Sequence, residues 1–387
     1  MSLRFMTAGE SHGPGLVAIL EGLPAGLALS ASDIDRDLAR RQLGHGRGGR
    51  MKIESDRAIV RSGIRHGLTL GSPIALLIDN RDYANWENRM NPWPVEEEVD
   101  EVHLPRPGHA DLAGVLKFGH TDVRNVLERA SARETAARVA VGALAKAFLR
   151  ELDVTIHSHV LRIGSVTAPA RPDLQPADFD GVDSSPVRCL DEAASGEMVA
   201  EIDRARKANE SLGGVFEVRA FGLVPGIGTY TTWDERLDGR LAFALMSIHA
   251  MKGVWIGDGF DLATRVGSEA HDEIFWDDER GYVRRTNRSG GIEGGMTTGE
   301  PVVAAVAMKP LPTLTKPLRS VDTETKEPAD ALRERTDSCT VPAAGVVGEA
   351  MMALELARAY RRKFGGDALE DVRGALDAYR ERIGWRR

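Results

Sequence analysis

The sequence predicts an α+β fold, because strand-like runs arrive as turn-linked pairs as often as they are separated by helical segments. A regular βαβ winding would alternate the two kinds of element along the whole chain. Composition supports an ordered globular protein, with 42% hydrophobic and 28% charged residues. Glycine is abundant at 41 residues and clusters in a few segments, as expected where tight loops approach a ligand or another backbone.

Strands are expected where short runs rich in Val, Ile and Leu are bounded by turn residues. These runs are residues 16–21, 57–64, 74–78, 154–163, 215–221 and 302–308. Helices are expected over residues 32–42, 131–151, 197–211, 238–252 and 346–364. The second helix should begin at the capping-box pattern of Ser131 and Glu134. The fourth should end at Gly253.

Three segments recur in the same order along the chain. The paired segments are residues 16–26 with 215–226, 63–73 with 291–301, and 129–142 with 335–348. The recurrence predicts an internal duplication, with a pseudo-two-fold axis relating residues roughly 1–150 to 190–387. No flexible linker flanks either half, so we expect one domain over residues 1–387 with a shared core. Residues 166–186 should form a surface connection between the halves.

Several classes of protein are disfavoured by composition. No apolar run is long enough to cross a bilayer, and the N-terminal residues do not resemble an export signal. Only Cys189 and Cys339 are present, outside any CxxC pair, which favours a reducing compartment and no cysteine metal site. We therefore expect a cytoplasmic protein without a metal. His157 and His159 share one side of a strand and are expected to face solvent.

Three short motifs match known patterns in the wrong context. The sequence GESHG at 9–13 fits a nucleophile elbow, but a strand-like run rather than a helix follows it. Gly44, Gly46 and Gly49 fit a dinucleotide fingerprint, but here the helix precedes the motif and the strand follows it. The single GRGGR at 46–50 lacks repeats and interleaved aromatics, and the net charge of −8 disfavours a nucleic-acid partner.

The remaining polar, Gly- or Pro-rich segments suggest chemistry on a small anion. Arginine offers forked donors for carboxylate and phosphate, and a helix start near Arg129 and Arg133 is a natural anion site. His12 and His109 lie in tight turns and can titrate near neutral pH. The segments are GESHG (9–13), RRQLGHGRGGR (40–50), RPGHAD (106–111), RASARET (129–135), HAMKG (249–253), KPLPT (309–313) and RTDS (335–338).

These motifs, together with NRSGGIEGGMTTG at 287–299 and RTDSCTVPAAGVVGE at 335–349, resemble the signatures of the chorismate synthases. The resemblance runs in order from residue 3 to about residue 364. It implies a β-α-β sandwich with helices between antiparallel sheets, assembled as a homotetramer. It also implies the last common step of the shikimate pathway, a 1,4-elimination of phosphate from 5-enolpyruvylshikimate-3-phosphate that gives chorismate. The family uses reduced FMN for this lyase reaction, without net redox change.

The resemblance also assigns residues. It implies catalytic roles for His12, His109 and Asp337. The implied cofactor-binding residues are Arg41 and Arg47 (at NADPH positions), Arg129, Ala130, Ser131, His249, Ala250, Gly294, Lys309, Pro310, Leu311, Pro312, Thr313 and Arg335. The implied substrate-binding residues are Arg47, Arg50, Arg106 and Arg133. His249 departs from the family, in which many members have Asn or Gln at this position.

Two alternatives remain open at this stage. One is a different flavin or phosphate lyase acting on a related anion, and the other is a Gly/Arg-rich RNA-binding module. The sequence also leaves open whether the protein reduces its own flavin with NADPH or relies on an external flavin reductase.

Overall fold

The structure is a computed structural model that describes residues 3–48, 55–334 and 337–385 of the 387-residue chain. Its first sheet is antiparallel, with the strand order β1-β2-β6-β3. These strands are β1 (Arg4–Ala8), β2 (Gly15–Glu21), β6 (Ile74–Asp79) and β3 (Ile59–Ser62). The inward side chains of β2 and β6 are buried and alternate with exposed ones in β2 and half-buried ones in β6, as expected for a sheet with one covered face.

The second sheet is also antiparallel, with the order β10-β15-β9-β7-β8. Its strands are β10 (Met251–Ile256), β15 (Val302–Met308), β9 (Gly214–Phe221), β7 (Thr155–Ile163) and β8 (Val166–Thr167). β9 and β15 are buried along almost their whole length because they occupy the middle of the sheet.

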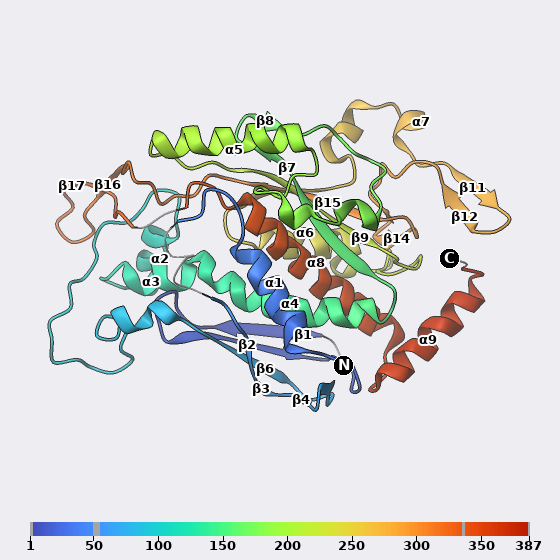
Figure 1. Cartoon of the computed structure of the whole chain (residues 1–387), viewed down its shortest axis with the longest axis horizontal. Helices are drawn as coiled ribbons and strands as arrows, with labels where there is room; N and C mark the ends of the chain where they lie inside the picture. The colour runs from blue at the N-terminus through green and yellow to red at the C-terminus, as the bar shows by residue number, and fades with distance from the viewer. Residues whose placement is uncertain (1–2, 49–54, 335–336, 386–387) are drawn as a thin grey trace.

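Three helices fill the space between the sheets: α1 (Ala31–Gln42), α4 (Thr135–Arg150) and α8 (Val341–Phe364). α4 packs on β2 and β6, α8 packs on β7 and β9, and the two helices pack on each other (Figure 1). A Cβ atom at Gly142 of α4 would lie 2.3 Å from the Cβ of Ala350 in α8. The helices therefore approach to near backbone contact, which only small residues permit.

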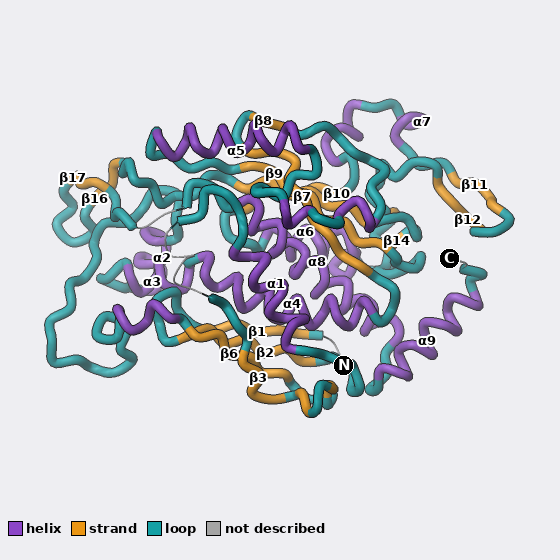
Figure 2. Tube along the Cα trace, in the orientation of Figure 1, coloured by secondary structure: helices purple, strands orange, loops and turns teal. Residues whose placement is uncertain are grey.

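The other elements lie around this frame (Figure 2). The helices are η2 (Arg81–Asn85), α2 (Asp111–Phe118), α3 (Arg124–Ala130), η3 (Ala132–Glu134), η4 (Pro176–Phe179), η5 (Val182–Ser184), α5 (Glu192–Lys207), η6 (Trp233–Glu235), α6 (Leu237–Met246), η7 (Gly259–Thr264), α7 (Gly267–Ala270) and α9 (Leu369–Arg382). The short strands are β4 (Ile64–Arg65), β5 (Leu68–Thr69), β11 (Ile274–Asp277), β12 (Gly281–Arg284), β13 (Ile292–Glu293), β14 (Met296–Thr297), β16 (Arg319–Val321) and β17 (Pro328–Asp330). Within the described residues, no helix has both the length and the apolar surface that crossing a membrane requires.

The hairpins β4–β5 and β13–β14 make matching hydrogen bonds. The Thr69 hydroxyl donates to the Pro24 carbonyl over 2.6 Å and accepts from the backbone N–H of Leu27 over 2.9 Å. The Thr297 hydroxyl donates to the Val224 carbonyl over 2.6 Å and accepts from the N–H of Ile227 over 2.9 Å. The two recurring Gly-rich segments thus fold to the same local structure.

The predicted mixture of helix and sheet is confirmed, with corrections at the boundaries. Ser131 caps the short helix η3, and α4 begins only at Thr135. The fourth predicted helix ends at Met246, and Gly253 lies in β10 instead, because β15 pairs with this segment. The helix predicted from residue 346 starts five residues earlier, at Val341.

The expectation that His157 and His159 face solvent is wrong. His159 is buried with its Nε2 3.1 Å from Glu217, and His157 stacks on Phe179 with ring centroids 5.0 Å apart. The cause is the segment 166–186, which runs along the surface as expected but turns the buried Phe179 inward against both histidine rings. Burial lowers the pKa of His157.

Candidate active site

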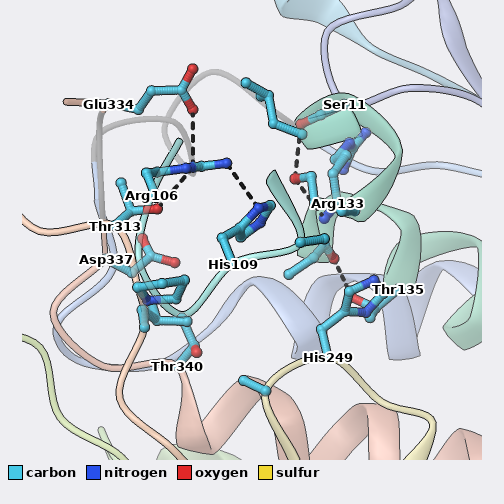
Figure 3. Close-up of a pocket in the computed structure, with 18 of the residues that line it drawn as sticks. Ser11, Arg106, His109, Arg133, Thr135, His249, Thr313, Glu334, Asp337 and Thr340 are labelled. Carbon is cyan, nitrogen blue, oxygen red and sulfur yellow. Dashed lines mark hydrogen bonds and ion pairs between the residues drawn. The ribbon is translucent and has the colours of Figure 1, made fainter. Parts of the chain in front are cut away.

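A cavity of about 750 Å³ opens where both halves of the chain meet. Its walls come from the β1–β2 loop, the end of α1, the α3–η3–α4 junction, the residues before β10, the segment after β15 and the start of α8. Figure 3 shows side chains from several of these elements, such as Ser11, Thr135 and His249, around one space. The volume lies in the range of small-molecule sites, about 300–1,000 Å³.

One wall holds buried arginines around a shared carboxylate. Arg41, near the end of α1, donates to the Thr135 hydroxyl and the Ala132 carbonyl, each over 2.9 Å. Arg133 donates to Asp56 over 2.6 Å, and Arg41 lies 3.5 Å from the same carboxylate. Burial lowers the pKa of Arg41 to about 9, with Asp56 opposing the shift. The Arg41 guanidinium therefore remains charged at neutral pH, and hydrogen bonds fix the positions of both groups.

The glycine-rich loop is held against the segment before α8. Arg47 forms an ion pair with Asp337 over 3.2 Å, and the N–H of Gly48 donates to the same carboxylate over 2.5 Å. A Cβ atom at Gly46 would lie 2.8 Å from the side chain of Ile202 and 3.2 Å from the backbone of Cys339. This close approach, at a φ of +89°, explains the glycine.

His12 enters the cavity from the β1–β2 loop. Its Nδ1 lies 2.9 and 3.0 Å from the two carboxylate oxygens of Glu128, and its backbone N–H donates to Glu128 over 2.8 Å. Its ring stacks on Trp86 at 4.0 Å. Arg124 donates to Glu128 over 3.0 Å and lies 4.9 Å from the Trp86 ring centroid.

His109 lies in the turn before α2. Its Nδ1 is 2.5 Å from Asp111, which Arg106 binds through its Nε over 2.9 Å. The Nη2 of Arg106 also lies 3.1 Å from the same ring nitrogen (Figure 3). Arg106 also donates to the Thr313 hydroxyl over 3.1 Å and lies 3.6 Å from Glu334. Contact with His109 and Arg106 keeps the pKa of Asp111 well below its ordinary value, although burial opposes the shift.

The opposite wall is less polar. Ile248, Ala250, Met251, Met308, Leu311 and Pro312 line it. Burial lowers the pKa of His249 to about 4, with the carboxylate of Glu134 4.0 Å away opposing the shift, so the ring is neutral at neutral pH. Lys309 donates to the Gly108 carbonyl over 2.8 Å at the edge of this wall.

Most of the predicted site residues meet in this cavity. Lining it are His12, Arg41, Arg47, Arg106, His109, Ala130, Ser131, Arg133, His249, Ala250, Lys309, Leu311, Pro312, Thr313 and Asp337.

Three predicted contacts are not among the described lining residues. Arg129 instead donates to the backbone carbonyls of Thr7 and Gly9, so its side chain is directed to β1. Gly294 lies in the turn between β13 and β14, and Pro310 lies between two lining residues without lining the cavity itself. Arg50 and Arg335 fall outside the described residues.

The sequence did not predict the buried carboxylates that bind the arginines and histidines of the cavity. Asp56 and Glu128 are buried at 5% and 3% exposure, and both bind lining residues that are distant in sequence. Trp86 was also missed. A signal for Glu128 was its place directly before the segment RASARET, on the same short helix as Arg124.

The charge of the lining defines the class of protein. Its cationic members are Arg41, Arg47, Arg89, Arg106, Arg124, Arg133, Lys309 and Arg333, against the acidic Glu334 and Asp337. A cationic cavity with two carboxylate-bound histidines suits an enzyme that acts on a small, multiply charged anion.

Comparisons with known proteins name the family. A family model described as chorismate synthase matches residues 3–360. The chain is 58% identical over 386 residues to the chorismate synthase of Rubrobacter xylanophilus, covering 99% of this chain and 98% of the relative. It is 58% identical over 382 residues to that of Desulforudis audaxviator, with 98% of each chain covered. A solved structure titled "Crystal Structure of Chorismate Synthase" superposes with a TM-score of 0.80 at 42% identity, covering 99% of this chain and 98% of the other. The chain belongs to the chorismate synthase family, whose members are lyases acting on phosphate esters.

Proposed function

We propose that the protein catalyses the 1,4-elimination of phosphate from 5-enolpyruvylshikimate-3-phosphate, giving chorismate, with reduced FMN and no net redox change. The observation that carries this proposal is the convergence of Arg47, Arg106 and Arg133 with His12 and His109 on one cavity. The substrate bears two carboxylates and a phosphate. Several fixed guanidinium groups are needed to offset that charge, and fixed cations stabilise the departing phosphate more than mobile ones.

The two histidines are the proposed proton donors, one near the leaving phosphate and one near the reduced flavin. Each is bound at Nδ1 by a carboxylate, which fixes the orientation of the ring. General acid catalysis of this kind typically contributes about 10²–10⁴ in rate. Asp337 is the proposed acid that assists removal of the C6 hydrogen, and its pairing with Arg47 keeps the carboxylate in the cavity wall.

The lining fits a flavin. A flat ring system needs an apolar wall, which Ala250, Met251, Met308 and Leu311 supply, and a phosphate tail needs a cation such as Lys309. We propose that Ala130, Ser131, His249, Pro312 and Thr313 complete this site. When bound, reduced FMN supplies transient electron density to the substrate as phosphate leaves.

The central test is direct. Purified protein with reduced FMN under anaerobic conditions should release phosphate and form chorismate from the phosphorylated substrate. His12→Ala and His109→Ala should each lower turnover by tens of times or more while FMN still binds. Absence of turnover in the unmodified protein would remove the proposed reaction, and wild-type turnover in both variants would remove the proposed proton donors.

We further propose that an external flavin reductase supplies the reduced FMN. Arg41, the family's NADPH position, is held inside the wall by Thr135 and Ala132, which suits a fixed anion contact. The pure protein with FMN should not oxidise NADPH anaerobically. Rapid oxidation would instead assign NADPH contacts to Arg41 and Arg47.

The layered arrangement supports a β-α-β sandwich built by internal duplication. The strand order β1-β2-β6-β3 corresponds to β7-β9-β15-β10, and both sets are antiparallel. On this reading the second half begins at β7, earlier than residue 190, and both halves share one core over the whole chain.

We propose a cytoplasmic homotetramer, which follows from family membership. Cys189 and Cys339 are both buried free thiols, as suits a reducing compartment. Exposed aromatic side chains such as Trp233 and Phe243 offer surfaces for association. Light scattering should give four times the chain mass of 42.0 kDa, and a monomer would contradict the assembly.

A further inference from the structure

The ring of His12 is held by one buried carboxylate. Glu128 contacts the ring at Nδ1 with both oxygens, at 2.9 and 3.0 Å, and its side chain is only 2% exposed. The same carboxylate accepts the backbone N–H of His12, so it fixes both the ring and the loop that carries it.

We propose that Glu128 is a positioning residue for the reaction: it holds His12 in the tautomer with the proton on Nδ1, and so presents Nε2 to the ligand. This inference rests on the proposed role of His12. A carboxylate is acceptor-only, so the ring nitrogen facing it must carry the hydrogen. Proton exchange with a ligand then passes through Nε2.

The groups around the pair favour a charged carboxylate. Burial by itself would raise the pKa of Glu128, but the hydrogen bond from His12 and the charge of Arg124 hold the pKa below its ordinary value. Trp86 covers one face of the imidazole ring. The other charged groups of this corner are Arg89, which lies 5.8 Å from the Trp86 ring centroid, and Glu334, which lies 3.7 Å from Arg124.

The second cavity histidine repeats the arrangement. His109 is bound at Nδ1 by Asp111, which is buried and binds Arg106, just as Glu128 binds Arg124. The two sets come from separate elements, α2 with its preceding turn and α3.

The test uses Glu128→Gln, which keeps the shape of the side chain and can still accept the His12 backbone N–H. Loss of the held tautomer should lower kcat by about tenfold or more, and KM for the substrate should change less than kcat. An unchanged kcat would contradict the positioning role. Glu217→Gln is the matched control, because Glu217 pairs with the buried His159 away from the cavity. It should leave kcat unchanged.

A second readout does not depend on turnover. In protein labelled with 15N-histidine, the ring signals of His12, assigned with His12→Gln, report which nitrogen carries the proton. Glu128→Gln should reduce the share of the Nδ1–H tautomer, and an unchanged tautomer would overturn the proposal whatever the activity. If Glu128→Gln does not fold, Glu128→Asp can be measured in its place. Its shorter carboxylate cannot contact both the ring Nδ1 and the backbone N–H of His12. Normal turnover in His12→Ala with an altered tautomer in Glu128→Gln would remove the role of His12 in the reaction, and with it that of Glu128, and would leave only the contact that sets the tautomer.

Discussion

Substitution of Glu349 in α8 tests which contacts hold the helices beside the cavity together. It is fully buried and accepts two hydrogen bonds from Arg40, at 2.8 and 2.9 Å. Arg188 donates to it over 3.1 Å, and Lys146 also binds it. These contacts join α1, α4 and the second half at one carboxylate. Arg40 is the neighbour of Arg41, so the same contacts place a cavity arginine.

Glu349→Gln keeps the volume of the side chain and removes its charge. Removing one partner of a buried ion pair typically costs about 3–5 kcal/mol, because the remaining charges stay buried without compensation. Asp37 still binds Lys146 over 2.8 Å and Arg40 over 2.9 Å, which places the expected loss at the lower end, about 3 kcal/mol.

The loss can be measured by urea unfolding followed by circular dichroism. Glu370→Gln is the control, because Glu370 is 81% exposed and pairs with Arg373 on the same helix. It should change the free energy of unfolding by less than about 0.5 kcal/mol. A loss below about 1 kcal/mol in Glu349→Gln would refute the assigned role of this cluster.

The pH dependence gives a second check with a defined sign. Burial alone would raise the pKa of Glu349, but Lys146, Arg40 and Arg188 hold the pKa well below its ordinary value. A depressed pKa contributes stability above the unfolded-state pKa of about 4.3, and this is lost as pH falls through the folded-state pKa. The stability gap between wild type and variant should therefore be largest near neutral pH and shrink below about pH 4.

Three further predictions follow from single contacts. Gly142→Val should destabilise the protein by roughly 1–3 kcal/mol through overpacking against Ala350, and adding Ala350→Gly should recover part of the loss in the same urea assay; no recovery would contradict the contact. His249→Asn should retain most of kcat at pH 7, because the histidine is neutral there, whereas a severe loss would show that the ring itself is needed. Thr69→Val and Thr297→Val should each cost about 1–3 kcal/mol by leaving buried backbone groups unpaired, and clearly unequal thermal shifts would argue against equivalent hairpins.

The sequence by itself determined the local structure and the family. Periodicity and turn residues located the central strands and α1, α4 and α8, because these signals depend on neighbours within a few positions, but they missed β1, β10 and α9. The recurring Gly-rich segments fold alike for the same reason, with Thr69 and Thr297 in matching bonds. The motifs also named the histidines and most of the arginines that meet in the cavity.

Only the tertiary structure decided which carboxylates bind those histidines and arginines. His12 meets Glu128 across 116 positions, and Arg133 meets Asp56 across 77, so no local pattern links either pair. The burial of His159 likewise depends on Glu217 in another strand and on Phe179, which the segment 166–186 turns inward. Electrostatic partners are selected by distance in space, and distance in space is set by the packing of the two sheets on the helices between them.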